Sequence, residues 1–284
     1  MHRRQIDIDL VRGALRKVRY ATGKSSYPFI SGDTYAGICD YRFNQKSSLA
    51  YIKKKDESIK LFLPANLKDR FLSELTSDKS DFSRDTLIIH NEDNIPSSAE
   101  MTIFSKRFKG VYSVNWLGDK EIATPIPIGL ENWSLLRNGV PADFLRLINQ
   151  GLNPTSKRSI RILSSFSIET NPAERSKAIE FAKSNSDVFQ MPTFTSPKKY
   201  REMLSNSAFV LSPPGNGIDC HRTWEALYLG AIPIVLRKYW PFSHMKLPVL
   251  VVEEWSEIPE MIAAASDWNL LSIEELRREF LTFP

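Results

Sequence analysis

Residues 207–236 carry the pattern that most constrains the fold of this chain. Two apolar runs, 208–211 and 231–236, are each long enough for a buried strand and too short for a helix. Between them a polar loop leads into residues 223–229, which have apolar side chains at helical spacing and end at Gly230. The order predicts a strand, a helix and a parallel strand, joined by the right-handed crossover typical of such units.

The loop before the predicted helix has features of an anion-binding site. Backbone N–H groups at a helix N-terminus lack intrahelical partners, and Gly215 and Gly217 let a phosphate approach them closely. His221 and Arg222 stand where the helix begins and can add charge-assisted hydrogen bonds. Glu225 lies one turn further on, where its carboxylate can accept from a ribose hydroxyl.

The same loop also has a purely structural interpretation. Glycine and proline are common wherever a chain turns, so a glycine-rich loop alone is weak support for a ligand site. In this interpretation the glycines only form the turn, and Arg222 pairs with Asp219 on the surface.

The stretch resembles the donor-binding signature of exostosin-like glycosyltransferases, R-x-x-E-A-L-x-x-G-x-I-P-[IV]. The matching residues are Arg222, Glu225, Ala226, Leu227, Gly230, Ile232, Pro233 and Ile234. Weaker similarities occur upstream, in FISGDT, LIIHNED and PIPIGLEN. The resemblance implies an α/β protein of GT-B architecture, in which two Rossmann-like domains face each other across a cleft and the second binds the donor.

The resemblance also implies an activity. It is that of an inverting, metal-independent glycosyltransferase, which moves a sugar from a UDP-sugar to a hydroxyl of a glycan or glycoprotein acceptor. The UDP-sugar is a co-substrate and no cofactor is expected; xylose is the favoured sugar because compact viral relatives decorate glycans with pentoses, with glucuronic acid and N-acetylglucosamine as alternatives. The expected donor-binding residues are Gly215, Asn216, Gly217, Asp219, His221, Arg222, Thr223, Glu225 and Arg175.

Two domains are expected from the length of 284 residues. An acceptor-binding domain spans 1–150 and a donor-binding domain 151–284, with a linker within 147–158 that is rich in polar residues and helix breakers. The basic segment 1–26 is expected to be a peripheral helix or arm. A capping-box pattern at Ser272 and Glu275 predicts a terminal helix, which in GT-B folds often crosses back onto the first domain.

Three residues are candidates for the general base that takes the acceptor proton. Asp33 can be the N-cap of a helix over 34–43, the base, or both. His90 and Asp93 follow the predicted strand 86–89, and ligands gather at the C-terminal ends of strands in open α/β sheets. Asp93 ranks behind Asp33, and His90 can instead have a structural role.

Three further residues are expected near the substrates. The P-I-G-L-E-N run resembles a cleft-lining segment of the same enzymes, which suggests Glu131 and Asn132 as sugar contacts, although its prolines alone predict only an irregular loop. Arg175 follows Asn171, a good N-cap, and either faces the diphosphate or lies on the surface.

Composition excludes several classes of protein. An apolar content of 42% and a charged content of 25% are those of a globular domain. The net charge of +5 has no nucleic-acid-binding motif beside it, so nucleic acid is not expected as a partner. Two cysteines form no disulfide framework, and the four histidines lack zinc-site spacing.

The location of the protein and an alternative function are further expectations. The N-terminal segment has no continuous apolar run, so we expect no signal peptide or membrane anchor and a cytoplasmic protein. Such short, unanchored chains resemble those encoded by large algal viruses, which would place this one in a host cytosol. The alternative function is a non-catalytic module of the same fold that binds a nucleotide or a glycan.

Overall fold

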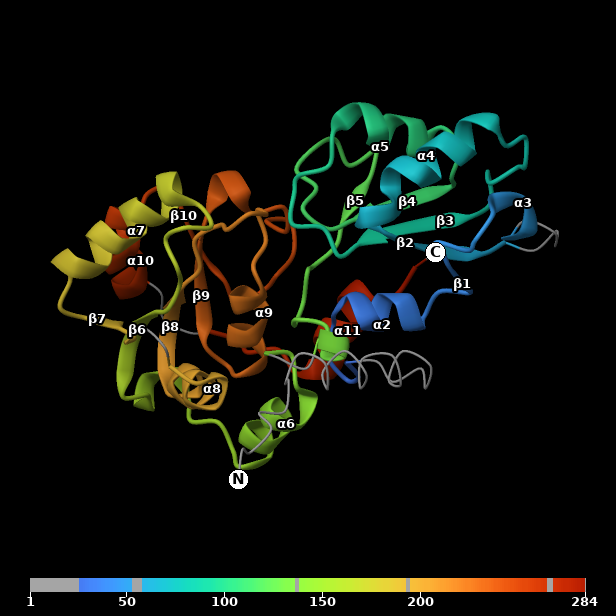
Figure 1. Cartoon of the computed structure of the whole chain (residues 1–284). Coiled ribbons are helices and arrows are strands. Elements are labelled where there is room, and N and C mark those ends of the chain that lie inside the picture. Colours follow the sequence, from blue (N-terminus) through green and yellow to red (C-terminus); the bar gives the residue numbers. More distant parts are fainter. Residues whose placement is uncertain (1–25, 53–57, 136–137, 193–194, 265–267, 284) are drawn as a thin grey trace, which may run out of the picture.

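The protein is an α/β structure with two parallel five-stranded sheets, which lie side by side in Figure 1. This computed structural model describes residues 26–52, 58–135, 138–192, 195–264 and 268–283. Residues 26–135, which carry one sheet, are termed the first half, and residues 138–283 the second half. The α/β class is confirmed and the sheets are consistent with two Rossmann-like domains, whereas the boundary at 150/151 stays a prediction. The predicted N-terminal arm lies outside the described residues, except for its last residue.

The first half is built on a sheet of strand order β1-β2-β3-β4-β5. The strands are β1 Tyr41–Arg42, β2 Lys60–Pro64, β3 Thr86–His90, β4 Gly110–Ser113 and β5 Thr124–Pro125. The helices are α2 Gly32–Gly37, α3 Leu49–Ile52, α4 Lys68–Ser77 and α5 Ser98–Ser105. The predicted strand at 86–89 is β3, and the apolar residues of β2 and β3 are buried.

The second half has strand order β10-β9-β8-β6-β7. The strands are β6 Ile160–Ser164, β7 Val188–Gln190, β8 Ser207–Leu211, β9 Ile232–Leu236 and β10 Leu250–Val252. The helices are α6 Pro141–Asn149, α7 Pro172–Ser184, α8 Pro197–Ser205, α9 His221–Tyr228, α10 Ile258–Ala264 and α11 Ile273–Phe280. Single 3-10 turns are Ala65–Leu67, Trp133–Leu135, Thr155–Lys157, Arg237–Tyr239 and Trp255–Glu257.

The predicted strand–helix–strand unit is confirmed as β8, α9 and β9. Strands β8 and β9 pair in parallel, with Phe209 opposite Ile232. Gly230 ends the helix with a φ of +67°, the left-handed conformation in which glycine is favoured after a helix. The predicted caps also form: Asn171 caps α7, and Ser272 and Glu275 make a capping box on α11.

One prediction about local structure is wrong. The first helix spans Gly32–Gly37 rather than 34–43, and its N-cap is Ser31, not Asp33. Ser31 has extended backbone angles, and its hydroxyl accepts from the Thr34 N–H (3.2 Å), so it fulfils the capping role two residues earlier. Asp33 therefore lies in the first turn of α2.

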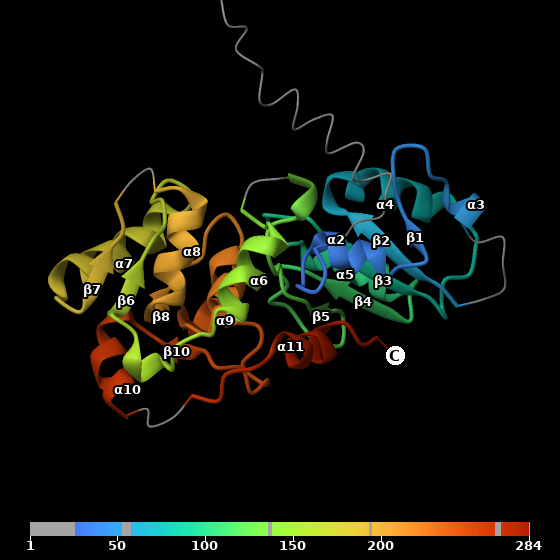
Figure 2. The same cartoon turned by 90° about the horizontal axis from the view of Figure 1, so that it is seen from below.

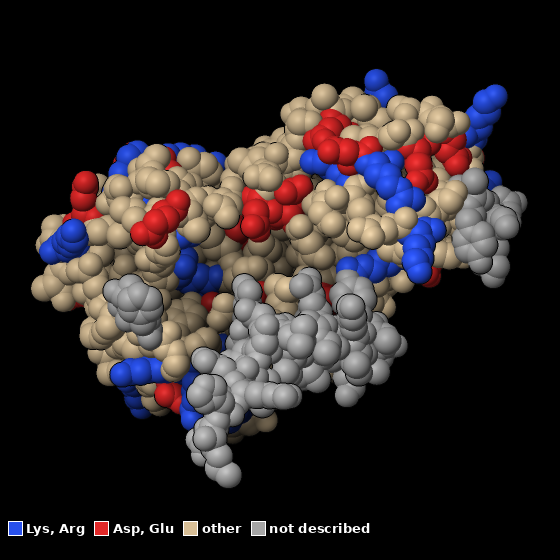
Figure 3. All heavy atoms as spheres, in the orientation of Figure 1, with Lys and Arg blue, Asp and Glu red and all other residues tan. Residues whose placement is uncertain are grey.

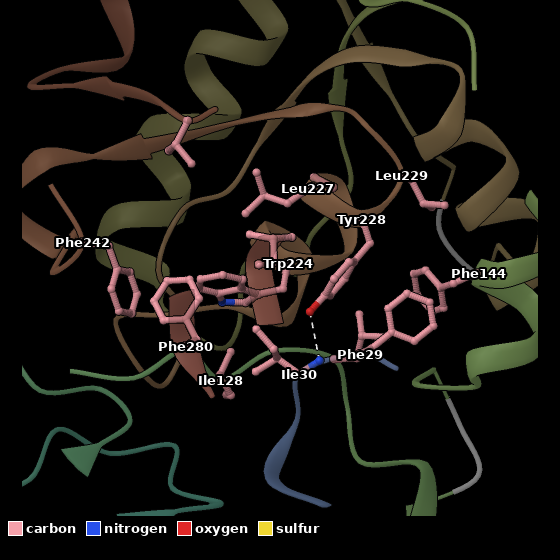
Figure 4. Packing of buried hydrophobic residues seen from close by; sticks show 14 of the residues in the cluster. Phe29, Ile30, Ile128, Phe144, Trp224, Leu227, Tyr228, Leu229, Phe242 and Phe280 are labelled. Carbon is pink, nitrogen blue, oxygen red and sulfur yellow. Dashed lines mark hydrogen bonds between the residues drawn. The ribbon is translucent and has the colours of Figure 1, made fainter. Parts of the chain in front are cut away.

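The two halves share one hydrophobic core, shown in Figure 4. Phe29 and Ile30 of the first half pack against Tyr228 of α9, and the Ile30 N–H donates to the Tyr228 hydroxyl (2.9 Å). Phe280 of α11 meets Trp224 edge-to-face, with ring centroids 5.3 Å apart. Figures 1 and 2 both show α11 at the junction of the halves, so the terminal helix helps to hold the sheets in place.

The surface is of mixed charge on the face shown in Figure 3. Basic and acidic side chains alternate there, and the excess of positive charge is not gathered into one large patch on that face. Within the described ranges, every helix is too short or too polar to cross a membrane.

We expect the Tyr228→Phe change to lower the free energy of unfolding by about 1–3 kcal/mol, because it leaves the buried Ile30 N–H without its acceptor. Urea denaturation monitored by tryptophan fluorescence measures this. Tyr112→Phe is the control, since the Tyr112 hydroxyl makes no hydrogen bond to the described residues. Equal stability of the two variants would show that the Tyr228–Ile30 bond does not support the junction.

Candidate functional site

A pocket of about 410 Å³ lies at the C-terminal ends of three neighbouring strands of the second sheet. Met191 follows β7, Ser165 follows β6, and the loop 213–220 follows β8. Such strand ends are where open α/β sheets bind ligands. Asp93 and Ile128 of the first half also line the pocket, so both halves form its walls. The other lining residues are Asn138, Thr170, Arg175, Thr195, Pro197, Tyr200, Gly215, Asn216, Gly217, Asp219, Cys220, His221, Arg222 and Glu225.

The Asp219 carboxylate fixes the loop that forms the pocket floor. Asp219 is buried, and its Oδ2 accepts from the Ile128 N–H of the first half (2.8 Å). Its Oδ1 accepts from the Cys220 N–H (2.8 Å), and the Trp224 Nε1–H lies 2.8–2.9 Å from both oxygens. Asp219 therefore joins the two halves and the first turn of α9 through one side chain.

This placement overturns the surface pairing of Asp219 with Arg222. Burial raises the pKa of Asp219 from 3.8 to about 6, even though its three donors favour the ionised form. Arg222 instead donates from Nε to the Ser165 carbonyl (2.7 Å), at the end of β6. The Asp219 carboxylate thus has a structural position, and the Arg222 side chain lines the pocket beside it.

Gly217 is required by a close approach between the halves. A Cβ at this position would lie 2.5 Å from Nδ2 of Asn115, which is closer than real contacts allow. Asn115 has a positive φ of 59°, and its Oδ1 accepts from the Asp219 N–H (3.1 Å) while its Nδ2 donates to the Glu92 carbonyl (2.7 Å). Packing against Asn115 therefore requires glycine at position 217, whether or not a phosphate approaches the loop there as predicted.

The amides expected to bind phosphate are not all open. The Gly215 N–H donates to the Gly217 carbonyl (3.0 Å), so this group is already engaged. Thr223 lies outside the pocket lining, and its hydroxyl shares a 2.8 Å hydrogen bond with Ser212 at the end of β8. Asn216 is exposed at the pocket edge.

Two arginines that line the pocket, Arg175 and Arg222, both lie close to the ring of Phe166. The guanidinium carbons of Arg175 and Arg222 lie 5.6 and 5.5 Å from the centre of the Phe166 ring. Arg175 is buried, and it donates from Nε to the Pro214 carbonyl (2.9 Å). Burial, and then the charge of Arg222, lower the pKa of Arg175. The prediction left Arg175 either at the diphosphate or on the surface, and the structure places it in the pocket wall.

Arg222 Nη1 is buried without a hydrogen-bond partner among the described residues. A buried guanidinium N–H that lacks an acceptor costs free energy, and an anion in the pocket would satisfy it. Two neighbouring cations at one pocket therefore favour a ligand with more than one negative charge.

Glu225 and His221 stand on the pocket side of α9. The buried Glu225 carboxylate accepts from the Tyr200 hydroxyl of α8 (2.8 Å). His221 Nδ1 lies 2.7 Å from the Gly129 carbonyl, which can only accept, so Nδ1 carries the proton. In the neutral ring Nε2 is then an acceptor, and it can accept a hydrogen bond from a hydroxyl group of a ligand.

Asp33, His90 and Asn132 form a connected group outside the pocket lining. The Asp33 N–H donates to Asn132 Oδ1 (2.9 Å), and Asn132 Nδ2 donates to Asn91 (2.8 Å). His90 is buried at the end of β3, with Nε2 3.1 Å from the Pro127 carbonyl and Nδ1 accepting from the Asn91 N–H (2.8 Å). Burial lowers the pKa of His90 to about 4, so the ring is neutral with both nitrogens engaged. This geometry favours a structural role for His90.

Of the three proposed bases, the structure brings Asp93 to the pocket. Asp93 is exposed and also lines a second cavity of about 490 Å³ on the first half. That cavity is polar, with Asn66, Lys68 and Asn91 among its lining residues. Glu131 does not line the pocket; its Oε2 accepts from the N–H of Asn138, which does.

Sequence reasoning missed two residues that shape the site, Tyr200 and Asn115. Tyr200 was missed because its partner Glu225 lies 25 residues further along the chain. Asn115 carries no motif, and its role depends on contact with a loop 104 residues away. A polar residue placed where a strand ends is the only signal that sequence offers for Asn115.

Comparison with known proteins gives one family match, which lies in the second half. Residues 168–283 match the family model of the RXYLT1 C-terminal domain, a xylosyltransferase domain related to the exostosins. The match includes Arg175, α8, the loop after β8 and α9. No curated protein matches the chain significantly. The match points to a glycosyltransferase.

We expect the stability difference between the wild type and Asp219→Asn to depend on pH. Because the folded pKa lies above the unfolded value of 3.8, the folded state binds more protons between pH 3.8 and 6. The contribution of Asp219 to the free energy of unfolding therefore falls as the pH rises through this window, by about 3 kcal/mol.

Urea denaturation of both proteins at intervals from pH 3.5 to 7 measures the difference. Other titrating groups, such as His90, act in both proteins and cancel. Asp187→Asn, at an exposed carboxylate, is the control for the substitution itself. A pH-independent difference for Asp219→Asn would contradict the raised pKa.

Proposed function

We propose that this chain is a nucleotide-sugar-dependent glycosyltransferase of GT-B architecture, with a UDP-sugar as donor and UDP-xylose favoured. Two parallel sheets that share a pocket, and the match over residues 168–283, support this proposal. The observation that carries it is the buried Nη1 of Arg222, which has no hydrogen-bond partner in the described part of the chain and lies near Arg175. A nucleoside diphosphate has the charge and the oxygen acceptors that this arrangement lacks.

The donor would lie across the strand ends of the second sheet. Its diphosphate would contact Arg175 and Arg222, and the free amides of the loop and of the first turn of α9 would add hydrogen bonds. Glu225 would accept from the ribose. His221 Nε2, on the side of the first half, would accept from a hydroxyl of the sugar.

The reaction we propose is one in-line displacement. The acceptor oxygen forms a bond to the anomeric carbon while the bond from that carbon to the β-phosphate oxygen breaks, with inversion. UDP leaves with the electron pair, and the acceptor proton passes to the base. The two guanidiniums stabilise the charge that develops on the leaving group, so that no metal is required for this task.

We assign the role of base to Asp93 ahead of Asp33. Asp93 lines both the pocket and the second cavity, whereas Asp33 lines neither. An acceptor glycan in the second cavity would reach the donor at Asp93, where the carboxylate can take its proton. The second cavity is thus the proposed acceptor site, on the first half as GT-B architecture requires.

Two substitutions separate binding from catalysis. Arg222→Ala should weaken UDP binding by about tenfold or more, because a charge-assisted contact is lost. Asp93→Asn should bind UDP as the wild type does but lower kcat about 100-fold or more, because proton transfer loses its acceptor. Calorimetry with UDP and an assay of UDP release from UDP-xylose, UDP-glucuronic acid and UDP-N-acetylglucosamine measure these effects, with and without chelator.

The controls are Arg161→Ala, an arginine stacked on Phe209 outside the pocket, and Asp187→Asn. Both should leave binding and turnover unchanged. UDP binding without transfer to any glycan would favour the non-catalytic module, and activity lost on chelation would refute metal independence. No binding of UDP or a UDP-sugar would refute the proposed function.

A further inference from the structure

The Tyr200–Glu225 pair is a built feature of the pocket, and its tyrosine has no role assigned so far. Tyr200 comes from α8 and Glu225 from α9, and both side chains line the pocket. The hydroxyl of Tyr200 donates to Glu225 Oε2 over 2.8 Å. Among the described residues, no hydrogen bond reaches the other carboxylate oxygen, Oε1. The pair thus uses one oxygen internally and leaves the second for a ligand.

The backbone around Tyr200 is held in place by the contacts of neighbouring residues. The next residue, Arg201, is buried and donates to the Asn138 carbonyl (2.9 Å) and to the Asp143 carboxylate of α6. Ser196 caps the start of α8 by accepting from the Lys199 N–H (3.3 Å). These contacts fix the position from which the Tyr200 hydroxyl reaches Glu225.

The phenol is a permanent donor in this setting. Burial, and then the charge of Glu225, raise the pKa of Tyr200 well above its ordinary value, so the hydroxyl keeps its proton. A carboxylate held at one oxygen by a fixed donor loses rotational freedom, and its second oxygen then has a defined direction. A ligand group that meets Oε1 must therefore be a hydrogen-bond donor.

The position of the pair along α9 indicates which part of a nucleotide it meets. Arg222 and Glu225 are three residues apart and thus neighbours on one helix face, with Cβ atoms about 5–6 Å apart. The ribose of a nucleoside diphosphate lies directly beside its α-phosphate. A diphosphate at Arg222 would bring the ribose hydroxyls, which are donors, to Glu225.

We propose that Tyr200 is a positioning residue that orients Glu225 toward the ribose 2′-hydroxyl, so that the pocket selects ribonucleoside over 2′-deoxyribonucleoside diphosphates. This inference rests on the proposed function. It assigns the selectivity to the fixed geometry of the pair, and not to Glu225 alone.

The test is calorimetric binding of UDP and of 2′-deoxy-UDP to the full chain. The wild type should prefer UDP by about tenfold or more, as expected for a hydrogen bond to a charged group. Tyr200→Phe should reduce this preference to about threefold or less, and should change the affinity for 2′-deoxy-UDP by less than about twofold. Tyr112→Phe, at a half-buried phenol outside the pocket, should leave the preference unchanged.

A double-mutant cycle distinguishes positioning from a structural effect. Glu225→Gln should weaken the preference by itself, and adding Tyr200→Phe to it should cause little further loss, because the tyrosine acts through the carboxylate. Weaker binding of both nucleotides to the same degree in Tyr200→Phe would indicate a structural role and overturn the inference.

The outcomes also separate this inference from the proposed function. If the wild type binds UDP and 2′-deoxy-UDP equally well, the proposed selectivity for the ribose is refuted, while the transferase proposal stands. A wild type that binds neither would refute the proposed function itself.

Discussion

The rest of the structure depends on the buried Asp219 carboxylate. It accepts the Ile128 N–H of the first half, the Cys220 N–H where α9 begins and the indole N–H of Trp224 in the shared core. All of these partners donate, which favours the ionised carboxylate, although burial opposes ionisation and raises the pKa. One charged group thus fixes both the start of the signature helix and its distance from the first sheet, and through them the width of the pocket.

The pocket is consequently a property of the docked halves. Hydrogen bonds cross the junction between Ile30 and Tyr228, between Ile128 and Asp219, and between Gly129 and His221. The first two of these bonds are buried. A wide opening of the halves would break them and expose the shared core in Figure 4. Local movement of the loops at the pocket edge, where Asn216 and Asp93 are exposed, therefore costs less free energy than separation of the sheets. A ligand would enter and leave by this local movement.

Local patterns in the sequence were sufficient for much of the fold and for the donor side of the site. Apolar runs and caps such as Asn171 act over a few residues, so β8, α9 and α7 could be predicted. The signature also placed Arg222 and Glu225 at a pocket. Long-range contacts were out of reach: Ile128, the partner of Asp219, lies 91 residues away, and among Asp33, His90 and Asp93 only the last lines the pocket that the docked halves form. The helix start at Ser31 was missed because serine and aspartate are both good caps.

Hydrogen–deuterium exchange with and without saturating UDP tests the central claim most directly, which is that the strand ends of the second sheet form the nucleotide site. The account predicts slower exchange in residues 165–175 and 215–225, with β1 to β4 of the first half unchanged. Protection confined to the first half, or bound UDP with no protection in either of these two segments, would contradict it.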